Sequence, residues 1–168
     1  MSNLISVRGF TPRIGKDCYV APSAWIIGDV QVGDRCSFWF NVTLRGDVMP
    51  IRVGNEVNIQ DGTVVHGTYG EFGCTIADRV TVGHNVTLHG CEIGREALIG
   101  MSATVMDGAV IGEQSLIGAG SLVTQGSRIP PRSLALGRPA KVIRSLTAEE
   151  IASLTQSADN YLLYKSWY

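Results

Sequence analysis

The chain has 168 residues, enough for one domain with a substantial core. Lysine and arginine total 14 against 15 acidic residues, and the resulting net charge of −1 argues against a nucleic-acid partner or a basic membrane-binding patch. No apolar run approaches the roughly 20 residues of a membrane-spanning helix, and the N-terminus lacks the pattern of a signal peptide. The four cysteines form no CxxC pair, so we expect a reduced, soluble, cytoplasmic protein.

An aliphatic side chain recurs every six positions along most of the chain. Neither the helical period of 3.6 nor simple alternation produces such a spacing. The spacing predicts an all-β solenoid in which each hexad is one short strand and a corner, and three hexads close a triangular coil. The predicted inward positions are Ile14, Val20, Ile26, Val32, Phe38, Leu44, Val53, Ile59, Val65, Ile76, Val82, Leu88, Ile93, Ile99, Val105, Ile111, Ile117, Val123 and Ile129.

The six-residue spacing is interrupted at three places. Nine residues separate Leu44 from Val53, which leaves room for residues 45–50 to bulge outward. Eleven residues separate Val65 from Ile76, which predicts a loop over residues 66–73. The step from Leu88 to the next inward position is five residues, one short. All three interruptions surround the histidines of the chain.

The repeat stops after Pro139, and the remaining residues have a helical pattern. Thr147 and Glu150 have the spacing of a capping box, which begins a helix. We therefore predict a β-helix domain over residues 1–144, and residues 145–168 as one C-terminal helix packed along it.

The chain has three histidines, His66, His84 and His89. His66 follows Val65 and His89 follows Leu88, and these two aliphatic positions begin the same face of successive coils. The two imidazoles therefore share one slot on that face, about 4.8 Å apart along the stack. Two imidazoles at this separation can converge on one metal ion, at about 2.0–2.1 Å from each nitrogen.

His84 lies on a different face of the triangle and must join the other two from a neighbouring molecule. A cyclic trimer provides such a neighbour and creates three identical sites. In the same columns, Arg45 precedes His66 and Asp61 lies over His84. We expect Arg45 to reach Asp61 or Asp47 across the subunit boundary.

These motifs resemble the signature of the γ-class carbonic anhydrase-like family of hexapeptide-repeat proteins. The resemblance covers nearly the whole chain and implies a left-handed parallel β-helix with a C-terminal helix, assembled as a homotrimer. It also implies zinc, or alternatively iron(II) or cobalt, bound by His66 and His89 of one subunit and His84 of the next. The residues that carry the match are Arg45, Gly46, Asp47, Asn58, Ile59, Gln60, Asp61, His66, His84 and His89.

By the same resemblance, the activity is that of a zinc lyase. A metal-bound hydroxide at the trimer interface hydrates carbon dioxide reversibly to bicarbonate. Gln60 orients the hydroxide, Asn58 lies near the substrate, and Arg45 and Asp61 hold the interface.

The proton released in each turnover needs a route to solvent. The best-known members of the family carry a glutamate where this chain has Val48, and they have more acids in the loop after the first histidine. The replacement predicts low activity, with Cys91 near the site as a possible redox gate. The candidates to carry the proton instead are Glu71, Tyr69, Tyr161 and Tyr164.

Two other functions share this fold. Acyltransferases that use acyl-CoA are built on the same solenoid, but they use a histidine as a general base without metal. All three histidines of this chain belong to the predicted metal site, which leaves none to act as a general base. A trimeric scaffold that keeps a metal without catalysis is the third interpretation.

Overall fold

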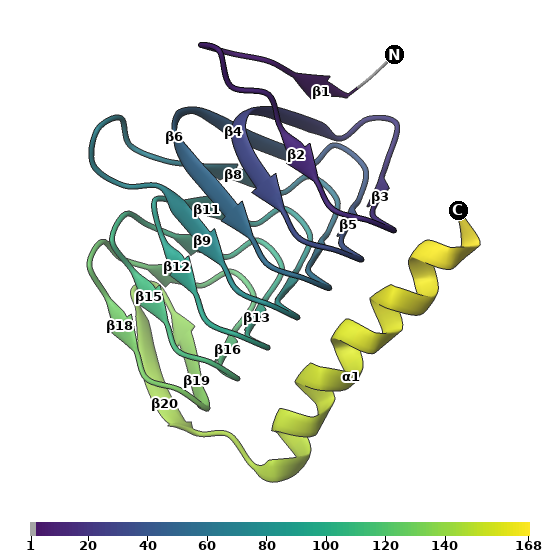
Figure 1. Cartoon of the computed structure of the whole chain (residues 1–168). Helices are drawn as coiled ribbons and strands as arrows, with labels where there is room; N and C mark the ends of the chain where they lie inside the picture. The colour runs from purple at the N-terminus through teal and green to yellow at the C-terminus, as the bar shows by residue number, and fades with distance from the viewer. Residues whose placement is uncertain (1–2) are drawn as a thin grey trace.

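The chain winds into a triangular stack of short parallel strands and ends in one long helix (Figure 1). The computed structural model describes residues 3–168. The left-handed β-helix expected from the family resemblance is confirmed. No helix within residues 3–168 is both long enough and apolar enough to cross a membrane.

Each of the three faces is a ladder of strands from successive coils. The first face, called A, consists of β2 (Arg13–Ile14), β9 (Cys74–Ile76), β12 (Glu92–Ile93), β15 (Val110–Ile111), β18 (Arg128–Ile129) and the second halves of β4 and β6. Face B consists of β3 (Tyr19–Val20), β5 (Ser37–Phe38), β7 (Asn58–Ile59), β10 (Thr81–Val82), β13 (Leu98–Ile99), β16 (Leu116–Ile117), β19 (Ser133–Gly137) and the antiparallel β20 (Ala140–Ser145). Face C consists of β1 (Leu4–Ile5), β8 (Val64–His66), β11 (Thr87–His89), β14 (Thr104–Val105), β17 (Leu122–Val123) and the first halves of β4 and β6.

Two long strands, β4 (Trp25–Val32) and β6 (Thr43–Val53), run around the corner from face C to face A. Gly28 pairs with Gly46 and Val30 pairs with Ile51, so one residue of β4 opposes four of β6. The bulge expected after Leu44 is therefore present at residues 47–50. A Cβ atom on Gly28 would lie 2.5 Å from the Gly46 carbonyl oxygen, so only glycine lets the strands pass this closely.

The predicted inward positions form the core. All of them are buried except Ile14 and Val20, which are partly buried in the first coil. Because each coil buries its aliphatic side chains against the coils above and below, the apolar column is continuous along the axis. The same stacking aligns corresponding residues of successive coils, which therefore form columns along the axis.

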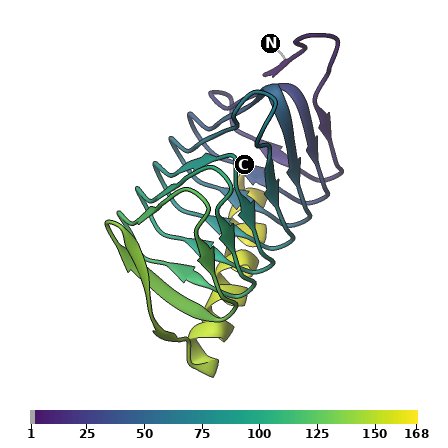
Figure 2. The same cartoon turned by 90° about the vertical axis from the view of Figure 1, so that its left-hand side faces the viewer.

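The C-terminal helix α1 (Ala148–Tyr164) and the short η1 (Lys165–Trp167) return along face B toward the first coils (Figures 1 and 2). The predicted capping box is present, because Thr147 Oγ1 accepts from the Glu150 N–H and Thr147 N–H donates to the Glu150 carboxylate. Arg79, at a corner of the stack, donates to Asp159 of the helix at 2.7 Å. These contacts fix the helix beside the stack.

Cys18 is the one cysteine of residues 3–168 that is not buried. A hydrogen bond from the Cys36 thiol is the largest cause that lowers the pKa of Cys18 to about 7, against partial burial. The thiolate is the reactive form, so we expect iodoacetamide to alkylate Cys18 with a half-maximal rate near pH 7 and about tenfold more slowly for each pH unit below. Mass spectrometry of the folded protein checks this, and Cys18→Ser should remove the fast-reacting thiol. Equal modification of the other cysteines would contradict it.

Candidate metal centre

Face C brings two of the three histidines together. His66 ends β8 and His89 ends β11, and the two residues are register partners on adjacent coils. His66 Nδ1 lies 3.3 Å from His89 Nε2, and the ring centroids are 5.3 Å apart. The stacked pair predicted from the six-residue register is present in the structure.

The separation of the two nitrogens fits a shared metal ion. Two ligands of a tetrahedral ion, each about 2.0–2.1 Å from the metal, have nitrogens about 3.3–3.4 Å apart. The observed 3.3 Å between His66 Nδ1 and His89 Nε2 has this value without any movement of the backbone. Imidazole nitrogen suits zinc, and it also suits iron, copper and nickel, so the donor type alone does not select the metal.

Each histidine has its own carboxylate partner. Such a partner fixes which ring nitrogen carries the proton and leaves the other nitrogen available as a ligand. The three pairs are His66 Nε2 with Asp47 Oδ1 at 3.1 Å, His84 Nδ1 with Asp61 Oδ2 at 2.9 Å, and His89 Nδ1 with Asp107 Oδ1 at 2.7 Å.

The Asp107 contact was not predicted from the sequence. Asp107 lies across the corner from His89, opposite Gly90, where a Cβ atom would come within 2.1 Å of the Asp107 carboxylate. The second carboxylate oxygen of Asp107 accepts from the Thr68 hydroxyl at 2.8 Å. Asp107 therefore holds both His89 and the loop that follows β8. The sequence offered one signal for this contact: Leu88 and Ile93 are five positions apart instead of six, so the corner between them is one residue shorter than the others.

Electrostatics favour the neutral form of the first histidine. Burial is the largest cause that lowers the pKa of His66, and the nearby Arg45 guanidinium lowers it further, against the hydrogen bond to Asp47. Partial burial raises the pKa of Asp47, but hydrogen bonds from Arg45 and His66 outweigh it and keep the pKa below its usual value. A neutral imidazole beside an ionised carboxylate is the state that binds a metal ion.

His84 lies beyond the end of β10, at the corner between faces B and C, where it pairs with Asp61 as the register predicted. Within residues 3–168 of one chain, no three histidine, cysteine or acidic side chains form a group suited to a metal ion. One chain thus brings together two of the three imidazoles and holds the third apart. The His84 side chain is 42% exposed, so it is accessible to a second molecule.

Gln60 and Asn58 form a buried amide chain along β7. Asn58 Nδ2 donates to the Thr81 hydroxyl at 2.9 Å, and Gln60 Nε2 donates to Asn58 Oδ1 at 3.2 Å. Both polar groups of the Asn58 amide are engaged, and the side chain is almost fully buried. Within residues 3–168, no hydrogen bond engages Gln60 Oε1, the remaining acceptor of the two amides.

Three other predicted site residues, Arg45, Glu71 and Tyr161, make no hydrogen bond to a histidine within residues 3–168. Arg45 donates to Asp47 of its own chain at 2.6 Å. Glu71 is exposed in the loop after β8, and Tyr161 packs on the Trp39 ring at 5.6 Å. No hydrogen bond or ion pair within residues 3–168 joins Glu71 or Tyr161 to a histidine.

The remaining two residues of interest differ in their surroundings. Val48 is half-buried in the bulge of β6, one residue after Asp47. Cys91 is buried, and the neighbouring Cys74 thiol and burial raise its pKa well above the usual value. The Cys91 thiol is therefore protonated at neutral pH, the less reactive form.

Comparison with known proteins agrees with these motifs. The family model described as bacterial transferase hexapeptide (six repeats) matches residues 90–125. The probable carbonic anhydrase of Methanocaldococcus jannaschii is 53% identical over 89% of this chain and 93% of its own length. The mitochondrial gamma carbonic anhydrase 2 of Arabidopsis thaliana is 46% identical over 95% of this chain, which spans only 59% of that relative.

A solved structure is similar over its whole length. A putative acetyltransferase from Bacillus cereus superposes with a TM-score of 0.95 at 45% identity, over 99% of this chain and 100% of its own. High identity over almost all of the Methanocaldococcus relative, together with the repeat, establishes common descent. The chain therefore belongs to the γ-class carbonic anhydrase-like family of hexapeptide-repeat proteins.

Proposed function

We propose that this protein is a γ-type carbonic anhydrase that interconverts carbon dioxide and bicarbonate at three metal sites between the subunits of a homotrimer. The observation that carries the proposal is the pair of facing nitrogens of His66 and His89, 3.3 Å apart and each backed by a carboxylate. His84 of the next subunit is the proposed third ligand, and zinc the proposed metal, with iron(II) or cobalt as alternatives. Four free thiols support a reducing compartment, the cytoplasm.

Different residues of the chain have different proposed roles at the site. His66, His84 and His89 would hold a zinc ion, which would supply a Lewis acid that brings the pKa of a water molecule to about 7. Asp47, Asp61 and Asp107 hold the three ring orientations that leave one nitrogen of each histidine for the metal.

The amide chain of β7 has a positioning role in this proposal. Gln60 Nε2 is held by Asn58, so Gln60 Oε1 would accept a hydrogen bond from the attacking water and would align its oxygen toward the carbon of the substrate. Asn58 is then a residue that positions Gln60, and its own contact with substrate is not required. Arg45 keeps Asp47 ionised, in addition to any contact that it makes across the interface.

Hydration of carbon dioxide by the purified, metal-loaded protein tests the function. Stopped-flow measurements should show activity that is lost on chelation and restored by zinc, iron(II) or cobalt. Metal binding without hydration would favour the trimeric scaffold, and absence of bound metal would favour the acyltransferase reading suggested by the name of the Bacillus cereus structure. The facing nitrogens of His66 and His89, 3.3 Å apart, argue against the acyltransferase interpretation, because a single general base needs no second imidazole nitrogen beside it.

Proton export gives a second, independent test. Val48→Glu places a carboxylate beside Asp47, where the family resemblance predicts a glutamate, and we expect kcat at low buffer concentration to rise at least about tenfold. High buffer concentrations should reduce the difference, because buffer then carries the proton. Val48→Gln, of matched size without charge, is the control and should not raise kcat. Equal rates of Val48→Glu and the parent protein at low buffer would contradict the assignment of Val48.

A further inference from the structure

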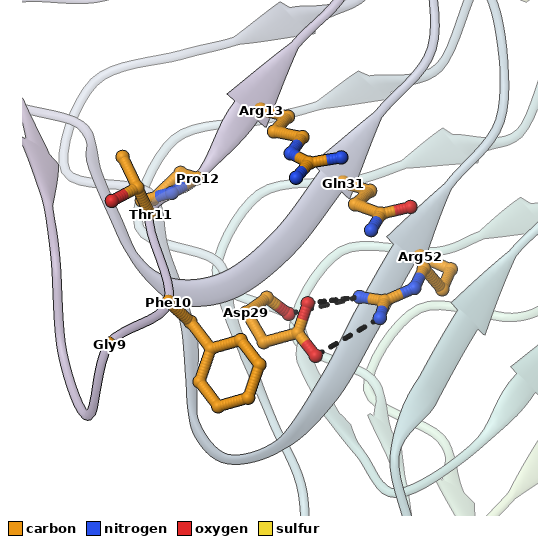
Figure 3. A pocket seen from close by; sticks show the side chains of 8 residues that line it. All are labelled: Gly9, Phe10, Thr11, Pro12, Arg13, Asp29, Gln31 and Arg52. Atoms are coloured by element: carbon orange, nitrogen blue, oxygen red, sulfur yellow. Dashed lines mark hydrogen bonds and ion pairs between the residues drawn. The ribbon is translucent and has the colours of Figure 1, made fainter.

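A cavity lies where the N-terminal segment meets face A (Figure 3). It has a volume of about 510 Å³. Neither a histidine nor any residue of the amide chain lines it. The lining residues are Gly9, Phe10, Thr11, Pro12, Arg13, Asp29, Gln31 and Arg52.

Three of these residues form a polar column on adjacent coils. Arg13 pairs in register with Gln31, and Gln31 pairs with Arg52, so their backbones follow one another at about 4.8 Å. Figure 3 shows the three side chains one above another on one side of the groove. Two arginines and a glutamine thus line one wall.

The two arginines differ in their hydrogen bonding. Arg52 is fully engaged, because it binds both carboxylate oxygens of Asp29 at 2.8 and 3.0 Å and donates to the Asp29 and Ile51 carbonyl oxygens. In the described part of the chain, neither the Arg13 guanidinium nor the Gln31 amide makes a hydrogen bond. With two arginines against one aspartate, the groove carries one uncompensated positive charge, located at Arg13.

An aromatic ring forms the opposite wall. Phe10 is 51% exposed, although it lies in a well-anchored segment. Its backbone exchanges two hydrogen bonds of 3.0 Å with Val7, and the neighbouring Arg8 donates to the Asp47 carbonyl oxygen at 3.2 Å. The ring lines the groove and lies outside the core, and Figure 3 shows it beside Asp29, on the other side of the groove from Gln31 and Arg13.

We propose that this groove binds a small aromatic carboxylate. Its carboxylate accepts from Arg13 and Gln31, and its flat apolar body lies on Phe10. A guanidinium fork matches the two oxygens of a carboxylate, and an ordered aromatic ring gives area at low cost in conformational entropy. Asp29 does not repel the ligand strongly, since Arg52 neutralises both of its oxygens.

Titration of the full-length, metal-loaded protein with benzoate, followed by ¹H–¹⁵N NMR, tests the proposal. We expect a Kd of about 1 mM, a range reached by small rigid ligands. Shift changes should centre on Arg13, Gln31 and Phe10. Arg13→Met should weaken binding at least tenfold. Arg128→Met, which removes another exposed arginine of face A outside the groove, is the matched control and should leave the Kd unchanged.

Three further probes separate the parts of the ligand. Benzamide, a neutral isostere, should bind at least tenfold more weakly than benzoate, and Phe10→Ala should weaken benzoate but not acetate. Inorganic phosphate should bind more weakly than benzoate because it cannot use the ring. The proposal would be overturned by shifts centred on His66 and His89, by an unchanged Kd in Arg13→Met, or by benzamide or phosphate binding as tightly as benzoate.

Discussion

Replacement of His84 by alanine should abolish metal binding while the solenoid remains folded. The parent protein is expected to hold about one metal ion per chain, and removal of one of three imidazoles leaves a two-nitrogen site that does not retain zinc at neutral pH. His84 lies at an exposed corner, outside the aliphatic column, so its loss creates no cavity in the core. Metal analysis of dialysed protein, with far-UV circular dichroism on the same sample, measures both outcomes.

A second substitution at this position controls for local damage. His84→Cys keeps a side chain that is itself a zinc ligand, so we expect it to recover part of the metal content. Loss of metal in both variants with unchanged dichroism would point to a requirement for imidazole. A full metal complement in His84→Ala would instead show that the ion is bound without this residue and would contradict the intersubunit assignment.

The Asp107 carboxylate should control metal affinity through the orientation of His89. Asp107→Asn removes the charge that accepts from His89 Nδ1 at 2.7 Å, and the ring then populates the tautomer in which the ligand nitrogen carries the proton. Loss of such a carboxylate partner typically weakens metal binding by 10–100-fold, so we expect about that decrease. Competition with a chelator gives the affinity, and ¹⁵N NMR of metal-free protein gives the tautomer.

Thr68 offers the matched control for Asp107. Thr68→Val removes the hydroxyl that donates to the other carboxylate oxygen but leaves the His89 contact in place. It should lower the affinity less than Asp107→Asn and should leave the His89 tautomer unchanged. If Asp107→Asn alters neither the tautomer nor the metal affinity, the carboxylate has only a structural role at this corner.

The six-residue period was sufficient to predict which residues stack. Once each aliphatic position is assigned to a face, the coil and the position of every neighbouring polar residue are known as well. This assignment placed His66 over His89 and Asp61 over His84. The period defines backbone register but not the direction of a side chain. Arg45 occupies the predicted column and binds Asp47 of its own chain, and the predicted contact across the subunit boundary stays a prediction.

Features outside the regular columns were not predictable in this way. Asp107 reaches His89 around a corner, from a position that the column does not include, because glycine at position 90 leaves room for its carboxylate. The groove at Arg13 depends on where the N-terminal segment folds back, and residues before the first hexad carry no periodic signal. Long-range contacts of irregular segments depend on packing that local pattern does not encode.

Complementation between two inactive variants tests the shared site most directly. His84→Ala and His66→Ala chains, each carrying a different affinity tag, should bind no metal alone. If they are refolded together and mixed trimers are isolated through both tags, one boundary in each cyclic trimer joins an intact face C to an intact His84. We therefore expect about one metal ion per mixed trimer, with carbon dioxide hydration partly restored. Mixed trimers without metal would contradict the account, as would a site that either variant fills alone.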